Sequence, residues 1–108
     1  MRVLFDQGTP VPLRAYLGQH EVRTASQQGW ATLKNGDLLT AAEAAGFTVL
    51  LTTDKNLRYQ QNLEGRKIAF VVLGRQQWPQ VQPHAQRVVA AVNAAELGGD
   101  VEIEIPSI

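Results

Sequence analysis

Short apolar runs alternate along the chain with polar or amphipathic stretches, and the runs have the length of β-strands. Residues 47–52 and 67–73 are mostly apolar without a break, as strands covered on both faces of a sheet are. Residues 101–105 alternate aliphatic side chains with glutamate, which predicts a half-exposed edge strand. The pattern as a whole predicts five strands, at residues 2–5, 20–24, 47–52, 67–73 and 101–105.

The stretches between these runs predict helices. Thr9 and Pro10 have the residue types of a helix cap and a first helical position. An alanine-rich stretch, capped by Asn35 or Asp37, is followed by Gly46, which stops a helix. The longest helix is expected where valines and alanines recur at helical spacing near the C-terminus. The predicted helices cover residues 9–18, 35–45, 56–61 and 79–97, and residues 25–36 are expected to form a loop.

Alternating strands and helices are typical of an α/β protein with a parallel sheet. We expect a three-layer α/β/α sandwich with a mostly parallel five-stranded sheet, formed as one domain by residues 1–108. Right-handed crossovers then place the loops that follow the strands at one edge of the sheet, which we call the carboxyl edge. These loops are residues 6–9, 25–37, 52–58 and 74–78.

Composition excludes several classes of function. Ten basic and ten acidic residues balance, so no broad positive field is available for duplex nucleic acid, and any such contact must use a local patch. The absence of cysteine excludes disulfides, thiolate metal sites and cysteine nucleophiles. The N-terminal residues have neither the pattern of a signal peptide nor the length of a membrane span. We therefore expect a cytoplasmic protein without membrane contact.

Three aspartates occupy positions that this fold would gather at the carboxyl edge. Asp6 follows the first strand, Asp54 follows the third, and Asp37 opens the helix before the third strand. Asp37 and Asp54 also have structural interpretations, as a helix N-terminal charge and a turn residue. Ligands of open α/β sheets bind at this edge, and carboxylates from separate segments suit Mg²⁺, which keeps several waters. A metal held there could assist an in-line phosphoryl displacement and activate water.

Basic and aromatic side chains are expected around this acidic centre. The basic residues could hold the phosphates that flank a reacting group, and the tryptophans could stack on an unpaired base. Individually, such lysines and arginines are usually solvated surface charges. Packing against the long helix is the simpler interpretation of Trp78, and partial burial is the simpler interpretation of Trp30. The residues in question are Lys34, Lys55, Arg58, Arg75, Trp30 and Trp78.

Three blocks of sequence carry a resemblance to a known family. They are Arg-Val-Leu-Phe-Asp-Gln-Gly-Thr-Pro, Asn-Gly-Asp-Leu-Leu-Thr-Ala-Ala and Val-Leu-Leu-Thr-Thr-Asp-Lys-Asn-Leu. From residue 1 to about residue 73 the chain resembles the PIN-like domains, in particular the short prokaryotic branch of nucleases of toxin–antitoxin type. The resemblance implies a Mg²⁺- or Mn²⁺-dependent ribonuclease that cleaves single-stranded RNA, with Asp6, Asp37 and Asp54 as its metal-holding catalytic acids. It also implies a small antitoxin-like partner that blocks this edge.

The sequence departs from the family pattern at two places. Full PIN domains carry a glutamate on a helix in the region of residues 25–36, which here contains no acid. Glu43 does not replace it, because six residues turn it about 240° around the helix from Asp37. Asn56 stands where a fuller motif has a further acid, although its carbonyl could still bind a metal or orient water. We expect one weakly held metal and slow or absent activity. The candidate substrate-binding residues are Lys34, Lys55, Asn56 and Arg58.

Two other classes of function stay open. A PIN-like fold without catalysis could bind an antitoxin-like protein, or form a homodimer through the unpaired backbone of the edge strand at residues 101–105. A receiver-like signalling domain would use Asp54 as phospho-acceptor beside Asp6. That class needs a second acid directly after Asp6, where Gln7 stands, and a lysine at the end of the last strand.

Overall fold

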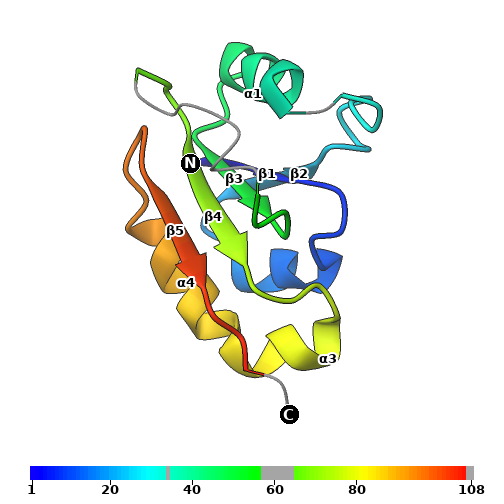
Figure 1. Ribbon diagram of the computed structural model, residues 1–108, viewed down its shortest axis with the longest axis vertical. Coiled ribbons are helices and arrows are strands. Elements are labelled where there is room, and N and C mark those ends of the chain that lie inside the picture. The colour runs from blue at the N-terminus through cyan, green and yellow to red at the C-terminus, as the bar shows by residue number, and fades with distance from the viewer. Residues whose placement is uncertain (34, 57–64, 107–108) are drawn as a thin grey trace.

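The computed structural model describes residues 1–33, 35–56 and 65–106 of the chain. Five strands form one sheet with the order β2-β1-β3-β4-β5, and all neighbouring strands are parallel. The arrowheads of β3, β4 and β5 point to the same end of the sheet in Figure 1. The predicted parallel α/β sheet is therefore confirmed, and every strand pair found in the described residues is parallel. The strands are β1 (Arg2–Phe5), β2 (Glu21–Thr24), β3 (Val49–Thr52), β4 (Ala69–Leu73) and β5 (Asp100–Ile103).

Helices cover both faces of this sheet, as predicted (Figure 1). Helix α1 (Asn35–Ala44) packs on one face, over a cluster that includes Leu4, Leu50 and Phe70. On the other face lie the 3₁₀-helix η1 (Val11–Tyr16), α3 (Trp78–Val81), η2 (Gln82–His84) and α4 (Ala85–Asn93). Neighbouring residues of β1, β3 and β4 enter opposite clusters, because successive side chains of a strand point to opposite faces.

Burial along the strands follows their position in the sheet. Every residue of β3 and β4 is buried, as expected for central parallel strands covered on both faces. β5 lies at one end of the sheet and is exposed at its first two residues, which confirms the predicted edge strand. Only β1 has the predicted bounds; the other strands are shorter than predicted or begin one residue earlier.

The first predicted helix is shorter and tighter than expected. It is a 3₁₀-helix that begins at Val11, with Pro10 at the cap position, so the prediction that Thr9 caps it is wrong. The Thr9 hydroxyl instead donates a buried hydrogen bond of 2.9 Å to the carbonyl of Leu51. The N–H of Leu13 donates to the carbonyl of Pro10, three residues earlier, at 3.1 Å, which is the hydrogen-bond spacing of a 3₁₀-helix.

The long helix predicted at residues 79–97 is divided in two and ends earlier. Pro83 lacks an N–H and its ring clashes with the preceding turn, so the chain tightens into η2 between α3 and α4. The predicted apolar face is nevertheless buried at Val81, Ala85, Val88 and Val92. The helix predicted at residues 56–61 lies, apart from Asn56, outside the described residues.

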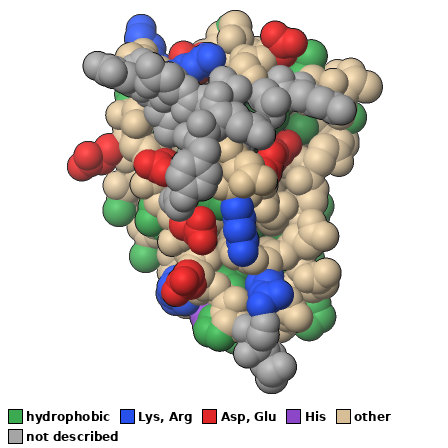
Figure 2. Space-filling model, in the orientation of Figure 1, with side chains coloured by type: hydrophobic (Ala, Val, Ile, Leu, Met, Phe, Trp, Pro, Cys, Tyr) green, Lys and Arg blue, Asp and Glu red, His purple; other side chains and the backbone are tan. Residues whose placement is uncertain are grey.

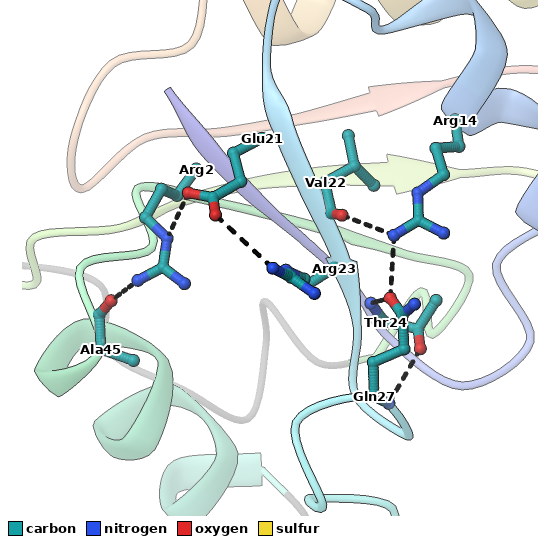
Figure 3. A network of polar contacts seen from close by, with 8 residues as sticks. All are labelled: Arg2, Arg14, Glu21, Val22, Arg23, Thr24, Gln27 and Ala45. Carbon is teal, nitrogen blue, oxygen red and sulfur yellow. Dashed lines mark hydrogen bonds and ion pairs between the residues drawn. The ribbon is translucent and has the colours of Figure 1, made fainter.

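Arg2 joins α1 to the first two strands (Figure 3). Its guanidinium donates a hydrogen bond to the carbonyl of Ala45 at the C-terminal end of α1 and pairs with Glu21 on β2 at 2.9 Å. The same guanidinium lies 4.3 Å from the ring centre of Phe47. A cation at this end of a helix interacts favourably with the helix dipole, so Arg2 stabilises the position of α1 on the sheet.

No helix within residues 1–33, 35–56 and 65–106 combines the length and the apolar character needed to cross a bilayer.

Candidate functional site

The strand order places a switch point between β1 and β3. From β1 the chain moves to β2 on one side, and it then returns to β3 on the other side of β1. In sheets of this kind, ligands bind outside the carboxyl ends of the strands where the order reverses. Asp6 follows β1 directly and Asp54 lies two residues after β3, so both aspartates flank this point.

Thr52, the last residue of β3, connects the two aspartates. It is fully buried, and its hydroxyl donates a hydrogen bond of 2.9 Å to Oδ2 of Asp6. The same hydroxyl oxygen accepts the backbone N–H of Asp54 at 3.1 Å. The buried hydroxyl thus orients the Asp6 carboxylate and fixes the start of the loop that carries Asp54, and it both donates and accepts a hydrogen bond, as buried polar groups usually do.

Both carboxylates are held by their own loops and keep a side open to solvent. Oδ1 of the half-buried Asp6 accepts the N–H of Gln7 at 2.8 Å, and the N–H of Asp6 donates to the Leu51 carbonyl at 2.9 Å. Oδ1 of the exposed Asp54 accepts the N–H of Asn56 at 3.0 Å, which is the geometry of an Asx turn. A carboxylate has about four lone-pair positions, so each aspartate retains capacity for a further ligand.

The loop after β1 makes a tight turn at the site. The N–H of Thr9 donates to the Asp6 carbonyl at 3.2 Å, and Gly8 at the third position has a φ of 87°. This conformation favours glycine. A Cβ added at Gly8 would lie 3.1 Å from both Gln76 Oε1 and Thr53 Oγ1. The loops that follow β1, β3 and β4 are therefore in close contact, as the parallel topology predicted.

Asp37 does not join this pair. It lies exposed in the first turn of α1, and no hydrogen bond or ion pair connects it to Asp6 or Asp54 within the described residues. Across residues 1–33, 35–56 and 65–106, no three acidic, histidine or cysteine side chains form a group that could hold a metal ion. The three-aspartate cluster expected from the sequence is therefore not formed. The physical reason is that α1 buries Leu38 and Leu39 against the sheet, which turns Asp37 to the solvent.

The structure describes two of the four predicted substrate-binding residues, Lys55 and Asn56. Lys55 is exposed and lines a hollow with Gly74 and Arg75, beyond the carboxyl ends of β4 and β5. Asn56 contributes its backbone N–H to Asp54, and its exposed side chain stays a predicted substrate contact. Lys34 and Arg58 lie outside the residues that the structure describes. On the face shown in Figure 2, acidic and basic side chains of the described residues lie interspersed.

The tryptophans and Glu43 have structural roles. Trp30 packs its edge on Phe47 with ring centres 5.9 Å apart, and Trp78 packs on the core beside Tyr16 at 5.8 Å. Both are partly buried, which confirms the interpretation of Trp30, and Trp78 packs against the cluster that contains Val81 of α3 and Ala85 of α4. Glu43 pairs with Arg66 at 2.8 Å near the opposite end of α1, in agreement with the prediction that it does not serve the site.

Two features of the site were missed by sequence reasoning. Thr52 could have been noticed, because it is a hydroxyl side chain at the end of an apolar run, two residues before an aspartate. The contact from Gln7 Nε2 to Ser26 Oγ, at 3.3 Å, joins the loops after β1 and β2. No pattern in the sequence indicates this second contact, because the two residues are 19 positions apart.

Comparison with models of protein families, with curated proteins and with solved structures finds no match for this chain. The resemblance to PIN-like domains therefore stays a prediction, and the function of the site is inferred from its own geometry.

Proposed function

We propose that the chain is a PIN-like, metal-dependent ribonuclease in which Asp6 and Asp54 hold a Mg²⁺ or Mn²⁺ ion. The observation that carries the proposal is the bridge through Thr52, which links the Asp6 carboxylate to the backbone N–H of Asp54 at the switch point of the sheet. When bound, the ion would supply charge stabilisation for phosphodiester hydrolysis and activate a water molecule.

The carboxylate oxygens of Asp6 and Asp54 fit an ion that keeps several of its waters better than an ion fully surrounded by protein ligands. Both side chains offer carboxylate oxygens, which hard divalent cations prefer, and Mg²⁺ is often bound through one or two carboxylates while it keeps several waters. Asp6 is half-buried and Asp54 is exposed, so water has access to the pair. With two carboxylates in place of the three expected, binding should be weak, and cleavage should be slow.

The residues around the pair would keep the carboxylates in position. Thr52 orients Asp6, and the N–H of Asn56 holds Asp54. The exposed Lys55, next to Asp54, would contact a phosphate of single-stranded RNA. A small antitoxin-like protein that covers the carboxyl edge would then block access of RNA to both aspartates. This arrangement would make the chain the toxin of such a pair.

Metal binding tests the proposal directly. Titration calorimetry with Mn²⁺ on the wild-type chain should give a measurable affinity, and Asp6→Asn and Asp54→Asn should each weaken it at least tenfold. Glu96→Gln is the matched control, because this exposed carboxylate lies beyond α4, near the opposite edge of the sheet. Cleavage of single-stranded RNA should require Mn²⁺ or Mg²⁺ and stop on addition of chelator. An Asp6→Asn chain that binds Mn²⁺ as the wild type does would overturn the proposal.

Measurements on the same proteins also distinguish the proposed nuclease from the two other classes of function. A non-catalytic interaction module would bind its partner protein with no metal-dependent RNA cleavage. A receiver-like domain would become labelled at Asp54 by acetyl phosphate, detected by mass spectrometry. Either result, together with unchanged Mn²⁺ affinity in both asparagine variants, would replace the nuclease assignment.

A further inference from the structure

A hollow of about 220 Å³ opens beside Asp6, between the carboxyl ends of β1 and β2. We call it the β1–β2 hollow. Its wall contains Asp6 and Gln7 from the loop after β1, Val11 from the start of η1, and Thr24 and Ser26 from the end of β2. The hollow is therefore continuous with one of the two proposed metal-binding carboxylates, although it lies on the side away from β3.

Neutral hydrogen-bonding groups line this hollow. Gln7 Nε2 donates to Ser26 Oγ at 3.3 Å, which leaves a second amide hydrogen and the amide oxygen of Gln7 available toward solvent. The hydroxyl of Ser26 keeps its own hydrogen for donation. Thr24 Oγ1 accepts the N–H of Gln27 at 3.1 Å (Figure 3), so its hydroxyl hydrogen is also available. A ligand can thus meet both donors and acceptors here.

The rest of the wall is apolar or acidic. Val11 stands at the lip with 52% of its surface exposed, and the buried Phe5 and Ala25 form the base. No lysine or arginine of the described residues lines the hollow, and Asp6 is its one charged side chain within that part of the protein. A phosphate would therefore be repelled. A neutral ligand with hydroxyl and amine groups and a flat apolar face would be accepted.

We infer that the β1–β2 hollow binds a nucleoside of the RNA, next to the phosphate that the proposed metal ion at Asp6 would contact; this inference rests on the proposed function. Single-stranded RNA is recognised through splayed bases that hydrogen-bond along their edges and through the ribose 2′-hydroxyl. A glutamine amide can pair with the edge of an adenine. Gln7 is accordingly the residue that contacts the base, and the hydroxyls of Thr24 and Ser26 contact the sugar.

The inference can be tested with the metal-free wild-type chain and adenosine as the probe. In a ¹⁵N-resolved NMR titration, adenosine should shift the backbone amides of Gln7, Val11 and Ser26, whereas those of Glu96 and Gly99 should not move. Gln7→Ala should raise the dissociation constant roughly fivefold to tenfold, as the loss of one or two hydrogen bonds predicts. Gln19→Ala is the matched control, because Gln19 is an exposed glutamine beside a different hollow, near Tyr16 and Asn93. This control should bind adenosine as the wild type does.

Three results would overturn the inference: adenosine shifts confined to other residues, unchanged affinity in Gln7→Ala, or the same amides shifting with inorganic phosphate and not with adenosine. Failure here is distinguishable from failure of the proposed function. If Mn²⁺ binding depends on Asp6 while adenosine does not bind, the nucleoside site is wrong and the metal site stands. If adenosine binds as described while Asp6→Asn leaves Mn²⁺ affinity unchanged, the nucleoside site stands and the nuclease is wrong.

Discussion

The hydroxyl of Thr52 donates a hydrogen bond of 2.9 Å to Oδ2 of Asp6, and this contact joins the carboxyl ends of β3 and β1. The two residues are 46 positions apart in the chain, so the contact depends on the parallel pairing of their strands. Because Thr52 also accepts the N–H of Asp54, one buried hydroxyl connects a core strand to both acids of the proposed site.

Replacing Thr52 by valine should therefore affect stability and metal binding together. Thr52→Val keeps the shape of the side chain but leaves Asp6 Oδ2 and the Asp54 N–H without this partner. We expect a loss of about 1–2 kcal/mol in the free energy of unfolding, measured with urea, and weaker Mn²⁺ binding.

Thr48→Val is the matched control for that variant. The Thr48 hydroxyl, just before β3, is buried and has no hydrogen-bond partner among the described residues. Its replacement by a methyl group should leave the free energy of unfolding unchanged or raise it, since no bond is lost. Equal destabilisation by the two variants would contradict the role assigned to Thr52.

Arg2 should contribute more to stability than its neighbour Arg23. Arg2→Met retains the length of the side chain but removes the hydrogen bond to Ala45, the ion pair with Glu21 and the contact with the Phe47 ring. We expect a loss of about 1–2 kcal/mol in urea unfolding, because these contacts fix α1 on the sheet.

Arg23→Met is the comparison for Arg2→Met. Arg23 reaches Glu21 at 3.9 Å, and about half of its side chain is exposed (47%). An exposed ion pair of this kind contributes little, so the free energy of unfolding should change by no more than about 0.5 kcal/mol. A larger loss in Arg23→Met than in Arg2→Met would show that the helix contact is unimportant.

Gly8→Ala should be more destabilising than Gly29→Ala. Both glycines have positive φ, 87° and 78°, so an alanine at either position costs about 1–2 kcal/mol in backbone conformation. A Cβ at Gly8 would also come within 3.1 Å of Gln76 and Thr53, whereas nothing lies within 4 Å at Gly29. The difference between the two unfolding free energies measures the crowding of the loops at the site. If both variants lost the same free energy of unfolding, the loops around Gly8 would be able to move apart to accommodate a Cβ without a free-energy cost.

Asp37→Asn should leave Mn²⁺ affinity unchanged, in contrast to Asp54→Asn. Asp37 lies in the first turn of α1, where a negative charge stabilises the helix by about 0.3–1 kcal/mol, so the variant should lose no more than that amount of stability. Calorimetry with Mn²⁺ checks the first expectation, and urea unfolding checks the second. If Asp37→Asn weakened Mn²⁺ binding as strongly as Asp54→Asn, the result would support the three-aspartate site predicted from the sequence.

The differences between predicted and observed elements have local causes. Continuous apolar runs located β3 and β4, because a strand buried on both faces must be apolar along its length, and the alternation of aliphatic residues with glutamate located the edge strand β5. The prediction of one long helix was wrong because the apolar periodicity continues past Pro83, whereas this proline interrupts the regular α-helix. Thr9 has the residue type of a helix cap, but its hydroxyl is used inside the fold, by the carbonyl of Leu51.

The sequence by itself determined the parallel sheet and the positions of Asp6 and Asp54 at its carboxyl edge, because alternating strands and helices with right-handed crossovers bring the loops after the strands to one edge. That β1 and β3 are neighbours was decided by the tertiary structure. Only the tertiary structure decided which way the other side chains face. Burial of one side of α1 turned Asp37 to the solvent, and the pairing of distant strands brought Thr52 to Asp6 and Gln7 to Ser26. Contacts between residues far apart in the chain depend on packing in three dimensions, and no local pattern of residues encodes them.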